Sequence, residues 1–331
     1  MTLPRRDFLR AAAGGLAGGV LVGGARRRAG AAAPLRVSSP SLTIGIASIF
    51  TGYMTAKGFD REQGLEIVAE QAYVDPNTYY GDFVAGRFDI AIGSWDTFAA
   101  HYLQGVPIRL ISTVTTADLV GILVRKDGAR SVAELRGRQM AAPKATGTYR
   151  LIGALLKRFH NLALETDIPV LNVPSPATAV TYVLADRAEG ALGWEPSLSL
   201  GLQKQPDARI VYNLGEDYRA HTKETLYFFS FAAQKAFLDK NPGADQRLVA
   251  AFKRTAEALS RNVDEAVALA AKTMKIDEEP IRLAFRSGRI ALSVDAPTGA
   301  VRDALRRQCD FFADGGVFPR KIDDAFFHAS R

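Results

Sequence analysis

The sequence carries one helix–turn–strand pattern twice, as FVAGRFDIAIG at residues 83–93 and as VLADRAEGALG at residues 183–193. Each copy reads as the end of a helix, a tight acidic turn and a short buried strand. A tryptophan beside a carboxylate follows each strand, in Ser94-Trp95-Asp96 and in Trp194-Glu195-Pro196. The repeat predicts two similar α/β lobes, which would enclose a ligand cleft where their strand-end loops face each other.

A second, shorter similarity lies upstream of each copy. Thr51-Gly52-Tyr53 follows the first strong apolar run, and Thr146-Gly147-Thr148-Tyr149 follows a later one. Chance is the alternative explanation, because only four of the eleven columns of the main pattern are identical. The upstream Thr-Gly segment and the main pattern occur in the same order in both halves, and this favours duplication of a strand–loop–helix unit.

Residues 1–31 are interpreted as an export signal and are set aside from the fold. A twin-arginine pair in Arg5-Arg6-Asp7-Phe8-Leu9-Arg10 precedes a Gly- and Ala-rich stretch over 11–25, and Ala29-Gly30-Ala31 offers a cleavage site. These features resemble a Tat signal in which Pro4 replaces the usual Ser or Thr. A disordered basic tail is the alternative. We expect export to the periplasm by the Tat translocase.

Setting this segment aside changes the charge of the chain. The full sequence carries a net charge of +7, but residues 1–31 hold six arginines and one aspartate, so the remainder carries +2. We find no basic stripe for nucleic acid in that remainder. Cys309 is the only cysteine and the four histidines are scattered, so we expect no intrachain disulfide, metal or cofactor. No later stretch reaches the ~18 apolar residues of a membrane span, and we expect a soluble monomer.

The order of expected elements is typical of an α/β protein with a largely parallel sheet. Strands are expected early in the chain at 42–47, 65–69, 89–93 and 108–114. Helices are expected between them at 55–63 and 96–104.

Two later strands would connect the lobes. A long strand at 119–126 is placed at a crossover and 226–231 is the expected return strand. From residue 239 onward the pattern is helical. We therefore expect a first lobe over 35–119, a second lobe over 120–228, and a mostly helical completion of the first lobe over 229–331.

Several motifs carry a resemblance to a known family. LVRKD at 123–127, SVAELRGR at 131–138 and PKATGT at 143–148 resemble the opening of the second lobe in ABC-transporter substrate-binding proteins. The Trp-acid-Pro of residues 194–196 and FLDKNP at 237–242 fit the same pattern. The sequence is most similar to the nitrate/sulfonate/taurine group and its relatives for thiamine pyrimidine precursors.

The resemblance implies a type II periplasmic binding protein, in which two α/β lobes joined by hinge strands close on a ligand. It implies a solute-binding protein of an ABC importer, with a membrane permease as partner and no catalysis. A solute receptor for a membrane sensor is an alternative. An enzyme similar to the pyrimidine synthases of this fold is another, although their Cys-rich motif has no counterpart in a chain with one cysteine.

Four loops supply the expected ligand contacts. Thr146-Gly147-Thr148 offers hydroxyls and backbone N–H groups at a helix start, and Thr51-Gly52-Tyr53 offers the same from the first lobe. The Ser94-Trp95-Asp96 loop, and Trp194 with Glu195, would suit a flat or cationic group. Ordinary helix caps and core tryptophans are the alternatives.

The charges of these loops leave the ligand open. Helix N-termini favour an anion such as a sulfonate or nitrate. Asp96 and Glu195 would instead favour an amine or a heterocyclic N–H group if both face the cleft, and only Lys144 among these loops is basic. A zwitterion such as taurine would satisfy both ends.

Overall fold

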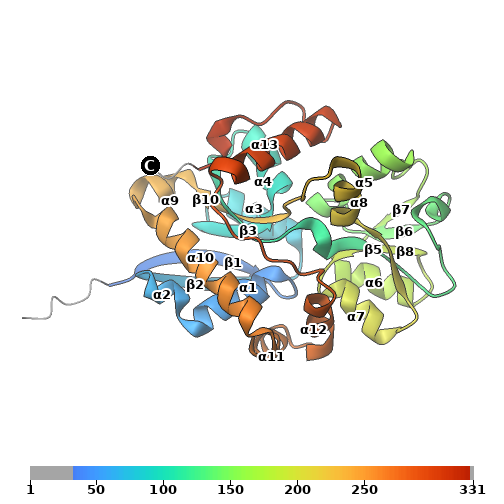
Figure 1. The fold of residues 1–331 in the computed structure, drawn as a ribbon, viewed down its shortest axis with the longest axis horizontal. Helices are drawn as coiled ribbons and strands as arrows, with labels where there is room; N and C mark the ends of the chain where they lie inside the picture. The colour runs from blue at the N-terminus through green and yellow to red at the C-terminus, as the bar shows by residue number, and fades with distance from the viewer. Residues whose placement is uncertain (1–32, 329–331) are drawn as a thin grey trace, which may run out of the picture. The chain divides into compact units, whose positions relative to one another are not determined.

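The computed structural model describes residues 33–328, and these form one compact unit. The predicted export signal over 1–31 lies outside the described residues. Two groups of β-strands organise the unit, and helices cover both faces of each group (Figure 1). We call them the first and the second lobe.

The first lobe holds a parallel pair and an antiparallel triplet of strands. Its five strands are β1 (Leu35–Leu42), β2 (Leu65–Tyr73), β3 (Ile90–Ser94), β4 (Ile108–Thr113) and β10 (Phe229–Gln234). β1 pairs with β2, and β10 lies between β3 and β4. β1 also runs beside the residues that lead into β3, where Asp89 N donates to Ser38 O at 3.1 Å and Ser38 N donates to Asp89 Oδ2 at 2.8 Å.

The second lobe holds one five-stranded sheet in the order β7-β6-β8-β5-β9. Its strands are β5 (Val120–Val124), β6 (Met140–Ala142), β7 (Val170–Asn172), β8 (Gly190–Trp194) and β9 (Arg209–Asn213). β6 is parallel to β7 and β8, whereas β5 is antiparallel to β8 and β9. In Figure 1 this sheet lies to the right of the labelled first-lobe strands.

Helices flank both groups of strands. The first lobe carries α1 (Ile46–Lys57), α2 (Phe59–Glu62), α3 (Pro76–Val84), α4 (Trp95–Leu103), α9 (Lys235–Lys240), α10 (Ala244–Arg261) and α11 (Val263–Met274). The second carries α5 (Gly147–His160), α6 (Pro176–Leu184), α7 (Ser197–Lys204) and α8 (Leu214–Thr222). Short 3-10 turns occur at η1 (Ala117–Leu119), η2 (Val132–Leu135) and η3 (Asp324–Phe326). In the second lobe α5 packs beside α8, and α6 beside α7 on the other face (Figure 1).

Two C-terminal helices contact the second lobe. α12 (Glu278–Arg286) packs on α7, and α13 (Gly299–Asp314) reaches α5 and α8 through Phe311. The Phe311 ring lies 6.0 Å from that of Phe159 and 5.2 Å from that of Tyr218, centroid to centroid. Burial of such aromatic surface is the main stabilising term, at roughly 25 cal/mol per Å².

Several chain segments cross between the lobes. Isolated bridges join Thr116 to Tyr227 and Thr115 to Leu292, so the connection before β5, the return before β10 and the segment after α12 run side by side. β5 to β9 all fall within the 120–228 expected for the second lobe. The boundaries themselves stay predictions, because the described residues form a single compact unit.

The expectation of a first strand over 42–47 is wrong. β1 ends at Leu42, and α1 begins at Ile46. The first six residues of α1 are all buried, and four of them, Ile46, Ala47, Ile49 and Phe50, are apolar. A short apolar segment of this kind is compatible with a buried strand or a buried helix, and its periodicity cannot separate the two.

The repeated pattern forms the same local structure twice. α3 and α6 each begin at a proline, and each ends at an alanine cap followed by one residue in the left-handed region. That residue is Gly86 with φ of 79° in the first copy and Asp186 with φ of 57° in the second. The two upstream Thr-Gly segments do not form the same structure. Thr51-Gly52-Tyr53 lies inside α1, whereas Thr146 caps the start of α5.

Candidate functional site

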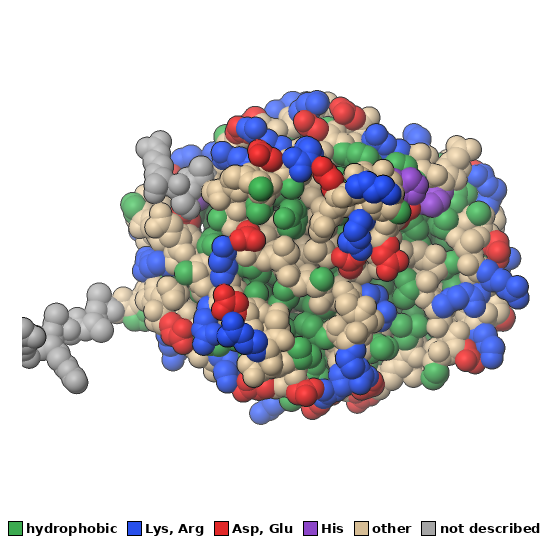
Figure 2. All heavy atoms as spheres, in the orientation of Figure 1, with side chains coloured by type: hydrophobic (Ala, Val, Ile, Leu, Met, Phe, Trp, Pro, Cys, Tyr) green, Lys and Arg blue, Asp and Glu red, His purple; other side chains and the backbone are tan. Residues whose placement is uncertain are grey.

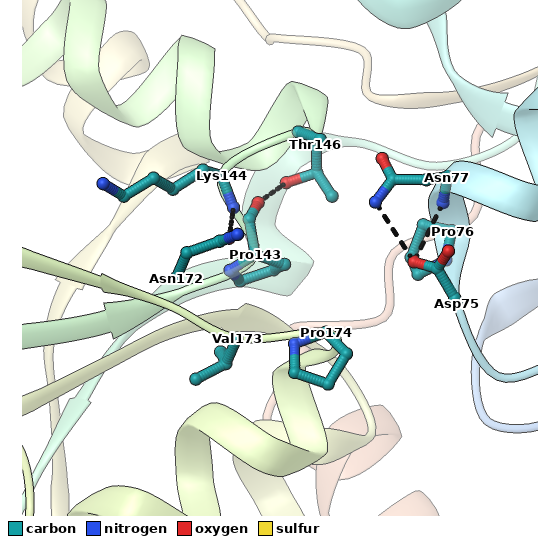
Figure 3. Close-up of a pocket in the computed structure, with 10 residues that line it drawn as sticks. Asp75, Pro76, Asn77, Pro143, Lys144, Thr146, Asn172, Val173 and Pro174 are labelled. Carbon is teal, nitrogen blue, oxygen red and sulfur yellow. Dashed lines mark hydrogen bonds between the residues drawn. The ribbon is translucent and has the colours of Figure 1, made fainter.

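A hollow of about 340 Å³ opens between the two lobes, and we call it the mouth (Figure 3). The first lobe lines it with the start of α3 at residues 75–77. The second lobe lines it with the loops at 143–146 and 172–174. The loops that follow β6 and β7 therefore face a helix N-terminus of the first lobe, as expected for strand ends in an α/β protein.

Polar groups at the mouth bond to one another. Asp75 caps α3, where its carboxylate accepts from Asn77 N and Thr78 N, both at 3.1 Å. Lys144 N donates to Asn172 Oδ1 at 3.1 Å, and Lys144 Nζ pairs with Glu165 at 2.5 Å (Figure 3 draws the first of these). The mouth is therefore built by local hydrogen bonds, and its one lysine is already paired with a carboxylate.

Two further hollows share the lining residue Pro76 with the mouth. A side pocket of about 90 Å³ lies between residues 42–44 of the first lobe and the start of α6. An inner pocket of about 20 Å³ lies between β3, the start of α5 and Trp194. Since one water needs ~10–15 Å³ on this measure, the inner pocket has room for about one water and is nearly closed.

The inner pocket has aromatic and aliphatic walls with a few hydroxyls. Trp194 and Phe229 meet edge to face with ring centroids 6.5 Å apart, and both are almost fully buried. Tyr80 Oη accepts from Ser94 N at 2.9 Å. Burial raises the pKa of Tyr80, so its hydroxyl stays protonated and keeps a hydrogen to donate. The pocket would have to widen before the flat or apolar part of a ligand could lie against these walls, because it has room for about one water.

The N-terminus of α5 forms another part of this wall. The Thr146 hydroxyl accepts from Tyr149 N at 3.4 Å, and Gly147 and Thr148 line the inner pocket. Gly147 lies so close to the first lobe that a Cβ atom there would overlap with Asp96 Oδ1 and Ser94 Oγ. Only glycine allows this approach.

Asp96 joins the two lobes through an ion pair. Arg150 on α5 donates to Asp96 Oδ2 from Nε at 3.0 Å and from a terminal nitrogen at 2.7 Å. The same terminal nitrogen donates to Thr97 Oγ1 at 2.7 Å. The Asp96 side chain is fully buried, so this arginine supplies the counter-charge that a buried carboxylate requires.

Glu195 is paired in the same manner on the other side of the cleft. Its carboxylate accepts from Arg289 Nε at 2.5 Å, and from Ser199 N and Ser199 Oγ, both at 3.0 Å. Burial raises the pKa of Glu195, while Arg289 and Ser199 oppose that shift by bonding to the ionised form. Glu195 does not line any of the three hollows.

The structure brings five of the eleven expected ligand contacts to the inner pocket: Ser94, Thr146, Gly147, Thr148 and Trp194. Asp96 lies directly behind Gly147. Whether these side chains touch a ligand stays a prediction.

The other expected contacts lie elsewhere. Trp95 is fully buried between Phe312 and Phe318, with ring centroids 6.0 and 5.9 Å away, and its indole N–H donates to Tyr227 O at 2.9 Å. The Thr51-Gly52-Tyr53 segment lies within α1 because that helix begins five residues earlier, at Ile46. Tyr53 donates to Glu265 Oε2 on α11 at 3.0 Å and so points away from the cleft.

Sequence reasoning missed several wall residues: Leu42, Pro76, Phe228 and Phe229. One signal was available, because the prolines that start α3 and α6 are one hundred residues apart, as are the two tryptophan loops. Both prolines line the side pocket. Extending the repeat upstream to these helix starts would have placed them there.

Within residues 33–328 we find no group of His, Cys, Asp or Glu side chains that could hold a metal ion. In the same range no helix combines the length and the apolar character needed to cross a membrane. On the face in Figure 2, acidic and basic side chains are interspersed.

The chain has the fold seen in periplasmic binding proteins. The periplasmic aliphatic sulphonate binding protein of Escherichia coli superposes with a TM-score of 0.71 over 90% of this chain and 93% of that one, at 20% identity. A ligand-binding component of an ABC-type import system from Staphylococcus aureus superposes with a TM-score of 0.68 over 89% of this chain and 97% of that one, at 14% identity.

The sequence gives the family. Residues 48–266 match the model of the NMT1/THI5-like family, and the chain belongs to that family. A protein of Brucella abortus that is named as a binding protein is 21% identical over 220 residues. That alignment covers 65% of this chain and 66% of the relative, just under two thirds of its length.

Proposed function

We propose that this protein is an exported solute-binding protein of an ABC importer, which captures a small organic solute in the cleft between its lobes. One observation carries the proposal. The mouth and the inner pocket are each walled by both lobes, so a ligand held there would contact both and would favour the closed arrangement.

The family and the fold support the same proposal. The structural neighbours are named for sulphonate binding and for ABC-type import, and the names of both describe binding, not catalysis. The proposed partner is therefore a membrane permease, the proposed location is the periplasm, and no bond is made or broken. The Tat route would deliver the chain to that location.

A search for the bound solute tests this proposal. The full chain would be purified under mild conditions, and its small-molecule content identified by native mass spectrometry. The compound found would then be added back in a thermal-shift assay. A ligand that binds only the native state adds about 2.7 kcal/mol of stability at a hundredfold excess over its Kd.

Two variants locate the binding in the cleft. Trp194→Ala removes a wall of the inner pocket and should clearly reduce the shift. Tyr182→Ala is the matched control, because Tyr182 is a half-buried aromatic residue of the same lobe that lines none of the three hollows. An equal loss in both variants, or an undiminished shift in Trp194→Ala, would contradict the proposed site.

A further inference from the structure

We propose that Asp96 occupies, with its own carboxylate, the anion position at the N-terminus of α5, so that the cleft selects uncharged ligands over anionic ones. This inference rests on the proposed function, since it names the class of solute that the same cleft would take. It makes Asp96 a specificity-determining residue that acts from behind Gly147.

The first step is the position of the carboxylate. A helix N-terminus carries partial positive charge and free N–H groups, and it attracts anions. α5 is 14 residues long, and its first residues Gly147 and Thr148 face the inner pocket. Asp96 Oδ1 lies against Gly147 at this N-terminus. The favourable place for one negative charge beside α5 is therefore taken by the protein itself.

The second step is that half of this carboxylate has no partner. Asp96 is fully buried, and its Oδ2 takes both hydrogen bonds from Arg150. Its Oδ1 has no hydrogen-bond partner among the described residues. An unpaired buried oxygen of this kind repels a second anion and attracts a hydrogen-bond donor. A ligand sulfonate or carboxylate at this end would meet like charge at close range.

The third step is the lack of a compensating cation. None of the residues that line the inner and side pockets is charged. Each nearby cation is already ion-paired within the protein. Arg150 pairs with Asp96, Arg289 pairs with Glu195, and Lys144 at the mouth pairs with Glu165. An anionic ligand would therefore lose its hydration without gaining a free positive charge.

What remains fits an uncharged ligand with an apolar or aromatic body. Trp194, Phe229 and Leu42 supply the walls, and the hydroxyls of Tyr80, Ser94 and Thr148 supply a few hydrogen bonds. Such a ligand differs from the sulphonate in the name of the Escherichia coli neighbour.

Matched pairs of probes test the inference without knowledge of the natural solute. Benzenesulfonate and benzenesulfonamide share one skeleton and differ in charge, as do ethanesulfonate and ethanesulfonamide. Binding of each to the full chain would be measured by isothermal titration calorimetry. In the wild type we expect the sulfonamide of each pair to bind at least about tenfold more tightly than the sulfonate.

Removal of the Asp96 charge should reverse this preference. Asp96→Asn keeps the shape of the side chain and releases Arg150, so sulfonate affinity should rise by about tenfold or more. Asp118→Asn is the matched control. It releases Arg219 from a pair of the same 2.7 Å length, and Asp118 lines none of the three hollows. It should leave sulfonate affinity unchanged.

A sulfonate that binds the wild type as tightly as its sulfonamide, or a folded Asp96→Asn variant with no gain for sulfonates, overturns the inference. Circular dichroism establishes that the variant is folded, and the contrast in the wild type needs no variant. Failure of the proposed function has a different signature. In that case no solute co-purifies and no sulfonamide binds, while the gain of Asp96→Asn for sulfonates can still be measured.

Discussion

The two strand ends with a tryptophan and an acid look alike in sequence but serve different purposes in the fold. Trp194 is the last residue of β8 and lines the inner pocket, whereas Trp95 is the first residue of α4 and is buried against Phe312 and Phe318. An offset of one hundred residues pairs Trp194 with Ser94, and Glu195 with Trp95. Ser94 and Trp194 both line the inner pocket, and Trp95 and Glu195 do not.

The comparison shows that position relative to the strand end decides the role, and the identity of the residue does not. The last residue of each strand, Ser94 or Trp194, faces the pocket, and a shift of one residue carries a tryptophan past the strand end and into the core. The residue before Ser94 and the residue before Trp194 are both glycine. A Cβ atom on Gly93 would clash with Tyr80, and one on Gly193 would lie 2.9 Å from Pro176. Both strands end where the helix before them packs closely.

The largest expected effect separates the two tryptophans by stability. Trp95→Ala leaves a cavity in the core and should lower the free energy of unfolding by about 3–5 kcal/mol. The ligand affinity of the folded fraction should stay within about twofold, because Trp95 lines none of the three hollows. Urea unfolding and titration calorimetry measure the two quantities. A loss of stability below about 1 kcal/mol would contradict its burial.

Trp194→Ala should show the opposite profile. It removes a wall of the inner pocket, so we expect ligand affinity to fall by about tenfold or more. The loss of stability should be smaller than for Trp95→Ala, because one side of this ring borders a cavity. Equal stability losses in the two variants would remove the distinction drawn between the strand ends.

The next effect concerns the acid that follows Trp194. Glu195→Gln keeps the volume of the side chain but leaves the Arg289 guanidinium without its counter-charge. Since Arg289 retains 17% side-chain exposure and can gain water, we expect a loss of about 2 kcal/mol. The double variant with Arg289→Gln should recover part of this loss in a double-mutant cycle. Additive losses would indicate that the pair is not coupled.

The smallest expected effect concerns the Thr51-Gly52-Tyr53 segment of the first lobe. Gly52 lies in the interior of α1, and a Cβ atom there would meet nothing within 4 Å. Gly52→Ala should therefore raise the free energy of unfolding by about 0.5–1 kcal/mol without changing ligand affinity. A clear loss of affinity would restore the original expectation that Gly52 contacts the ligand.

Much of the local architecture could be predicted from the sequence. The repeat placed the end of a helix, a tight turn and a short buried strand correctly in both copies, because these depend on neighbours within a few residues. A helix start at Thr146-Gly147-Thr148 was also expected, and α5 begins there with Thr146 as its cap. The first expected strand, at residues 42–47, was wrong because the buried start of a helix and a buried strand leave similar apolar patterns.

Local patterns in the chain were enough to predict two α/β units with strand-end loops facing each other, and they carry the family match. Which of those loop residues meet depends on tertiary packing. Asp96 pairs with an arginine 54 residues away and Glu195 with one 94 residues away, so both acids are ion-paired within the protein. Local spacing carries no information on contacts of that separation, because they depend on how the finished sheets and helices pack.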